Sequence, residues 1–156
     1  MDNQQTKEKN IDNTKVSHLR LILVGLFIGF LLNLTGWLGN NILLKDMWVD
    51  VGVALPEVAW RSNIWSDIFS LAPDFLYGFA IAWLCTALKT DSYSTIFNSL
   101  RVGVFVSLLG GITTYFAIAN SGFIPWKLAL ASFFLVIITK LPLAILAGKM
   151  LTPMKR

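Results

Sequence analysis

Charged side chains are scarce in this sequence. Asp, Glu, Lys and Arg make up 14% of its 156 residues, whereas 55% are hydrophobic, and the mean hydropathy is +0.64. A typical soluble domain carries about 25% charged residues, most of them on its surface. The composition therefore excludes an ordinary water-soluble domain and favours a membrane protein.

Cysteine and histidine are nearly absent as well. Cys85 is the only cysteine and His18 the only histidine. These counts exclude an intramolecular disulfide, a Cys-x-x-Cys centre, a histidine-based metal site and a serine–histidine triad. The sequence also lacks a glycine-rich phosphate loop and a pair of carboxylates at one depth within its apolar blocks. We therefore expect no enzymatic activity, no catalytic residue, no metal and no cofactor.

Apolar sequence, in contrast, is abundant and comes in long blocks. A bilayer core about 30 Å thick needs roughly 20 helical residues to cross it, and backbone groups have no water partners in lipid, so each span should be a helix. Four blocks are long enough, at residues 21–44, 68–88 (or a shorter version from Pro73), 102–119 and 126–148. The sequence predicts an all-α integral membrane four-helix bundle in contact with the lipid bilayer.

The segments around these blocks complete the predicted domain organisation. Residues 1–17 are polar and without apolar periodicity, so we expect a disordered cytoplasmic tail. Residues 45–65 hold three tryptophans, which are common at the headgroup level, so we expect an interfacial outer loop, with a substrate lid as the alternative. Residues 18–150 form one membrane domain, and residues 151–156 a cytoplasmic C-terminus.

Lysine and arginine are distributed unevenly along the chain. Three flank the blocks on one side, and nine lie on the side of both termini: Lys7, Lys9, Lys15, Arg20, Lys89, Arg101, Lys149, Lys155 and Arg156. Cytoplasmic loops carry the excess of positive charge, so both termini are predicted to be cytoplasmic. The net charge of +4 then reflects contact with anionic lipid rather than nucleic-acid binding.

Small residues follow one stripe of each block when it is projected as a helix at about 100° per residue. Small side chains let helix backbones approach each other, so these stripes are the predicted packing seams. The stripes contain Gly25, Gly29 and Gly36 in the first block, and Gly103 and Gly110 in the third. In the fourth block, Lys140 falls on the same face as Ala129, Ser132, Val136, Ala144 and Ala147.

Lys140 is the residue that most needs an explanation, because an ammonium is costly in hydrocarbon. With midplanes near residues 32, 78, 110 and 137, Lys140 lies about 4 Å inside the midplane and Asp74 about 6 Å outside it. Helical side chains lean toward their N-terminus, so the Lys140 stem points toward the level of Asp74. Asn33, Tyr77 and Thr114 complete the set of intramembrane polar candidates.

Ordinary alternatives stay open for each of these residues. Asp74 could be a wet residue in the first turn of a helix that starts at Pro73. Lys140 could snorkel to the cytoplasmic surface over a segment bent by Pro142. If Lys140 is buried, it serves either a structural ion pair or a transport or sensing role. Asn33 could simply hydrogen-bond across helices.

Three short motifs carry a resemblance: the run from Asn33 through Asn41-Ile42-Leu43-Leu44-Lys45-Asp46-Met47-Trp48, then Tyr77-Gly78-Phe79 with Trp83-Leu84, and finally Leu143-Ala144 with Ala147-Gly148. With them, residues 20–150 resemble small bacterial four-helix membrane proteins to which no activity is assigned. The resemblance implies a multi-pass protein of the bacterial inner (plasma) membrane. Such proteins often carry an acidic residue near this position, so Lys140 departs from their pattern, which argues against a fixed proton relay.

Two functional hypotheses follow. The first is an accessory or self-associating subunit that packs through its glycine-rich faces against a second copy or another membrane protein, as the Gly25-x-x-x-Gly29 pattern suggests. The second is a small transporter or channel component in which Lys140, Asn33 and Asp74 line a polar path for an anion or a proton-coupled solute.

Overall fold

The computed structural model of the chain describes residues 16–54, 64–88 and 94–152. Its elements, in chain order, are α2 (His18–Leu38), the π-helix η1 (Gly39–Leu43), α3 (Lys45–Ala54), α4 (Ile64–Ala87), α5 (Thr95–Gly111), the π-helix η2 (Ile112–Phe116), α6 (Ala117–Asn120) and α7 (Trp126–Leu151). The described part of the chain is thus all helical, as predicted.

Four helical segments are long and apolar enough to cross a membrane: His18–Leu43, Ser70–Ala87, Thr95–Asn120 and Trp126–Leu151. Between 22% and 39% of each segment is buried inside the molecule, so most of its apolar surface faces outward. Such a surface suits hydrocarbon and would be costly in water. The predicted four-span membrane bundle is confirmed.

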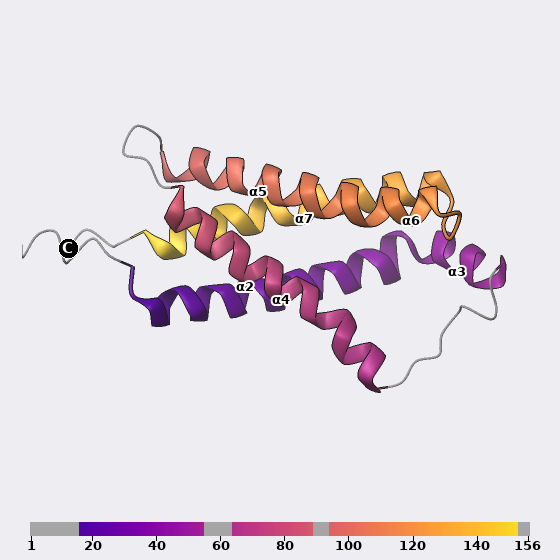
Figure 1. Cartoon of the computed structure of the whole chain (residues 1–156), viewed down its shortest axis with the longest axis horizontal. Helices are drawn as coiled ribbons and strands as arrows, with labels where there is room; N and C mark the ends of the chain where they lie inside the picture. The colour runs from indigo at the N-terminus through magenta and orange to yellow at the C-terminus, as the bar shows by residue number, and fades with distance from the viewer. Residues whose placement is uncertain (1–15, 55–63, 89–93, 153–156) are drawn as a thin grey trace, which may run out of the picture.

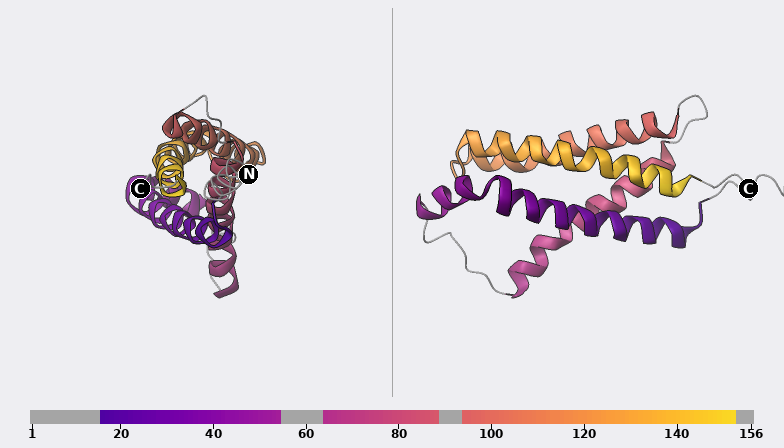
Figure 2. Two further views of the ribbon diagram at one scale, coloured as in Figure 1. Left: turned by 90° about the vertical axis from the view of Figure 1, so that its left-hand side faces the viewer. Right: turned by 180° about the vertical axis from the view of Figure 1, so that it is seen from behind.

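The bundle consists of two packed helix pairs. Figure 1 shows α5 and α7 side by side along their length, while α4 crosses α2 at a steep angle. The first turns of α4 point away from the other spans, which Figure 2 shows from two more directions. The second half of α4 returns to the bundle and contacts α5 and α7.

The start of α2 and the end of α7 lie together at one end of the bundle. The Arg20 guanidinium donates to the carbonyl of Met150, and to that of Thr152 at 3.2 Å, so it caps the C-terminus of α7. Carbonyl groups at a helix C-terminus lack partners within the helix, which makes a cation there favourable. Thr95, at the start of α5, meets Thr152 at the same end.

Glycine makes the steep crossing of α2 and α4 possible. A Cβ atom added at Gly78 would overlap the backbone of both Gly25 and Gly29. At Gly29, an added Cβ would lie 2.7 Å from the Cα of Phe75. The two backbones therefore touch at a point that no larger residue would allow.

Pro73 lies inside α4 rather than at its start. The interpretation of Asp74 as a first-turn residue of a helix beginning at Pro73 is therefore wrong, since α4 begins nine residues earlier, at Ile64. Pro73 lacks an N–H group, so the helix loses one backbone hydrogen bond at the level where its first turns leave the bundle.

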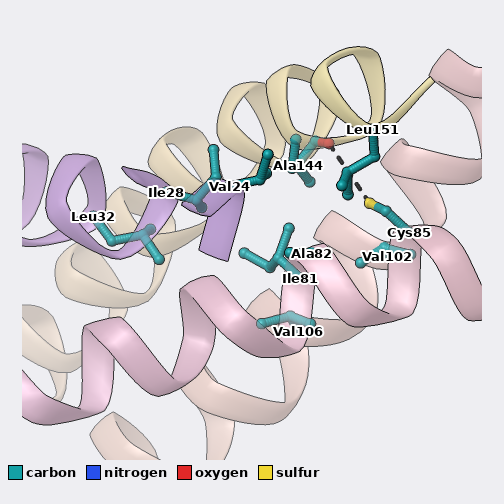
Figure 3. Close-up of a cluster of buried hydrophobic side chains, with 11 residues drawn as sticks. Val24, Ile28, Leu32, Ile81, Ala82, Cys85, Val102, Val106, Ala144 and Leu151 are labelled. Atoms are coloured by element: carbon teal, nitrogen blue, oxygen red, sulfur yellow. Dashed lines mark hydrogen bonds between the residues drawn. The ribbon is translucent and has the colours of Figure 1, made fainter. Parts of the chain in front are cut away.

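An apolar layer fills the middle of the bundle, and each of the four spans contributes to it. Figure 3 shows part of this layer, in which Ile28 of α2 and Ile81 of α4 are fully buried. We call it the central layer and define it by the buried residues Val24, Ile28, Ile81, Ala82, Val102, Val106, Ala144 and Ala147.

Several predicted segments fall partly outside the described residues. Of the predicted tail, residues 1–15 are outside, as are residues 153–156 of the predicted C-terminus. In the predicted outer loop, residues 45–54 form α3, residues 55–63 lie outside the described part, and Ile64 already belongs to α4. α3 packs at the far end of the bundle, where Met47, Trp48 and Val51 contact the apolar cluster around Leu128.

Candidate functional site

A cavity of about 610 Å³ lies between the four spans, in the half of the bundle away from the start of α2 and the end of α7. We call it the far cavity. Every span lines it, with residues from 32–41, 70–77, 110–115 and 135–140. All five intramembrane polar candidates line it: Asn33, Asp74, Tyr77, Thr114 and Lys140.

Lys140 is the most deeply placed charge in this cavity. Its residue is only 5% exposed, and its Nζ lies 3.5 Å from the centroid of the Tyr77 ring. An ammonium over an aromatic face is stabilised by the negative potential of the ring, by up to about 2 kcal/mol when it is desolvated. Lys140 follows the first residue of α7 by 14 positions and precedes the last by 11, so it lies near mid-span. The side chain is therefore buried within the bundle and does not snorkel to a surface.

Gly110 makes room for the pairing of Lys140 and Tyr77. A Cβ atom added at Gly110 would lie 2.7 Å from the Tyr77 hydroxyl oxygen and 3.1 Å from Lys140 Nζ. Both distances are below normal van der Waals contact. Gly110 of α5 thus leaves the space in which Tyr77 of α4 and Lys140 of α7 meet.

Asp74 supplies the opposite charge from another helix. It is half-buried on α4, and an added Cβ atom at Gly36 would lie 3.8 Å from its Oδ2. Asp74 and Lys140 attract each other electrostatically. Within the described residues, however, they form no contact ion pair. The structural ion pair and the transport or sensing role of Lys140 therefore both stay predictions.

Asn33 hydrogen-bonds across helices, as one of its interpretations predicted. Its amide nitrogen donates to Gly29 O at 3.0 Å within α2 and to Leu71 O on α4 at 3.3 Å. The second bond joins α2 to the segment of α4 just before Pro73. Asn33 thus joins two helices that line the far cavity and is itself one of the lining residues.

Tyr115 is a cavity residue that sequence reasoning missed. It interacts electrostatically with Asp74 and Tyr77 and lines the far cavity. A regular projection of the third span continues the buried seam from Gly110 to Thr114. The π-turn η2 adds a residue to that turn, which shifts the helix phase, so that Thr114 is exposed and Tyr115 is half-buried. No signal in the sequence marks that turn.

Two side chains at the rim of the far cavity are joined by a hydrogen bond. Trp48 of α3 donates from Nε1 to Asn40 Oδ1 at 3.0 Å. Asn40 lies in η1 and lines the far cavity. The half-buried Trp48 therefore fixes the position of a cavity residue.

The predicted glycine seams are used inside the bundle. Gly25 and Gly29 approach α4, Gly103 approaches Ala144 and Leu141 of α7, and Gly36 and Gly110 border the far cavity. An accessory or self-associating subunit would need a different surface, since the Gly25-x-x-x-Gly29 face is already buried by α4.

A second cavity, of about 760 Å³, lies at the end of the bundle where α2 and α5 begin and α7 ends. Its lining mixes apolar side chains, such as Leu21 and Trp83, with polar ones that carry little charge: Ser17, His18, Thr86, Asn98 and Ser99. On every span, the residues of the far cavity, of the central layer and of this second cavity follow one another in order. Two cavities at opposite ends are thus separated by one apolar layer.

Among the described residues, no group of three or more His, Cys, Asp or Glu side chains could hold a metal ion.

No family model, curated protein or solved structure matches the chain. The resemblance to small bacterial four-helix membrane proteins therefore stays a prediction.

Proposed function

We propose that the protein is a small transporter or channel component of the bacterial inner membrane, with its solute site in the far cavity at Lys140. A single observation carries the proposal. A buried ammonium near mid-span faces a cavity, and among the described residues its partners are an aromatic ring and a carboxylate that it does not touch. Ionisable residues inside membranes are costly, and they typically mark substrate or ion pathways.

The arrangement of the two cavities supports a pathway. A route that opens to one side at a time needs a polar space at each end and a barrier between them. The far cavity, the second cavity and the central layer have that order on every span. The proposal gives the charged side chains a binding role and assigns them no chemistry.

We place both termini in the cytoplasm, following the excess of lysine and arginine on their side of the membrane. The far cavity then lies in the outer half of the membrane, with Asn40 and Asn41 at its rim. The alternative of an accessory subunit has less support, since the glycine faces that suggested it are buried within the chain.

The proposal is tested by solute entry into proteoliposomes. Vesicles containing the protein are exposed to hyperosmotic glycine, potassium acetate or potassium chloride, and re-swelling is followed by light scattering. We expect faster re-swelling than in empty vesicles for at least one solute, and its loss in Lys140→Met. Lys149→Met is the matched control, because it removes an exposed lysine from the same helix. If no solute gives protein-dependent re-swelling, or if both variants behave alike, the proposal is wrong.

A further inference from the structure

The far cavity holds two opposite charges on different helices. Lys140 of α7 and Asp74 of α4 both line it, and they attract each other without forming a contact ion pair in the described part of the chain. Lys140 lies against the Tyr77 ring, and Asp74 lies near Gly36. Both charged residues therefore line the same cavity.

We propose that this cavity binds a small zwitterion, with an anionic group of the ligand against Lys140 and its ammonium group against Asp74. This inference rests on the proposed function, because it names the ligand class of the same site.

The charge balance of the cavity favours a zwitterion over an ion of either sign. With both side chains ionised, the pair is neutral. A bound anion would leave the cavity with a net negative charge, and a bound cation with a net positive one. Net charge inside a membrane-spanning bundle is costly, because desolvation is repaid only by a close opposite charge. A zwitterion gives each side chain a contact partner and keeps the cavity neutral.

The remaining lining suits a ligand of this kind. Thr114 and Tyr115 offer neutral hydrogen-bonding groups, and Leu32, Leu135 and Val136 offer an apolar wall. Neutral hydrogen-bonding groups can hold a polar ligand in orientation, and an apolar wall can accept a hydrocarbon part. A free amino acid has this chemistry, and so does a zwitterionic lipid headgroup.

Binding is tested on the full chain in nanodiscs made only of anionic phosphatidylglycerol, so that the lipid supplies no zwitterion. The probes are glycine and leucine as zwitterions, acetate as the anion and methylammonium as the cation, each followed by titration calorimetry. We expect at least one of the two zwitterions to bind tenfold or more tightly than either single-charge probe. Asp74→Asn should reduce its affinity to that of acetate, and Lys140→Met to that of methylammonium. Lys149→Met and Asp46→Asn, which change exposed charges, should leave the affinity unchanged.

A parallel arm distinguishes the two sources of the ligand. If the zwitterion is a lipid headgroup, nanodiscs that contain phosphatidylethanolamine should raise the unfolding temperature of the wild type. They should not raise that of Asp74→Asn or Lys140→Met. If acetate binds as tightly as both amino acids, and Asp74→Asn does not change the affinity, the cavity does not select a zwitterion and this inference is overturned. The proposed function would survive that result as an anion pathway. Absence of binding by the amino acids together with absence of a lipid effect would also overturn the zwitterion inference. Lys140-dependent re-swelling in acetate or chloride would then show that the proposed function survives.

Discussion

At the scale of single residues, the site depends on how a lysine is kept charged and in place without a salt bridge. The Tyr77 ring lies 3.5 Å from Lys140 Nζ, and Gly110 leaves the space in which the two side chains meet. An aromatic face attracts the ammonium without neutralising it. The positive charge therefore stays available to a ligand.

Replacing Tyr77 separates the role of the ring from that of its hydroxyl. Tyr77→Leu should lower the free energy of unfolding by about 0.5–2 kcal/mol, because the ammonium loses the aromatic face, and should weaken Lys140-dependent solute entry. Tyr77→Phe keeps the aromatic face, so we expect it to retain most of the stability and most of the Lys140-dependent solute entry. Chemical unfolding in mild detergent and the re-swelling assay check the pair. Equal loss in the two variants would assign the role to the hydroxyl instead.

At the scale of helices, the shape of the far cavity follows from the crossing of α2 and α4. The two backbones touch at Gly78, Gly25 and Gly29. Beyond that contact and past Pro73, the first turns of α4 leave the bundle (Figure 1). The close contact between α2 and α4, together with the departure of the first turns of α4 from the bundle, thus shapes the side of the far cavity that α4 forms.

Gly78→Ala should therefore be poorly tolerated. The added methyl would overlap backbone atoms of α2, which cannot rotate away as a side chain can, so we expect a loss of about 1–3 kcal/mol in the free energy of unfolding. Gly36→Ala is the matched control, since its methyl would make only an ordinary contact, 3.8 Å from Asp74 Oδ2. Unfolding in detergent compares the two variants. A Gly78→Ala protein as stable as Gly36→Ala would contradict this account of the crossing.

The sequence predicts the elements that follow a regular period and misses those that break it. The small-residue face of the fourth span is buried at Ala129, Ser132, Lys140 and Ala144. Hydrophobic blocks and a steady 3.6-residue period suffice for that result. The π-turn that brings Tyr115 to the cavity has no sequence signature. At Pro73 the sequence leaves a helix start and a helix interior both open, because proline suits a first turn as well as a kink.

At the scale of the whole molecule, the orientation of the bundle decides which side of the membrane the solute reaches first. The ends of α2 and α7 share one end with the start of α5, and the far cavity lies toward the other. The excess of positive charge on the side of the chain ends predicts that they are cytoplasmic. The far cavity would then face outward.

Site-directed labelling tests this orientation. In a Cys85→Ala background, which removes the only native thiol, Phe123→Cys marks the far end and Leu88→Cys the end with the chain termini. Both positions are 52% exposed. A membrane-impermeant maleimide should label Phe123→Cys in sealed right-side-out vesicles, and Leu88→Cys only after detergent is added. The reverse pattern would place both termini outside.

The contact of Arg20 with the end of α7 also bears on the order in which the helices are encoded. It brings the first and last spans together at Met150 and Thr152. A chain joined there by a short linker and opened between residues 88 and 94 would begin with α5 and finish with α4. It would keep both helix pairs and an even number of membrane crossings. We therefore expect the packing of the spans to be independent of which helix pair is synthesised first.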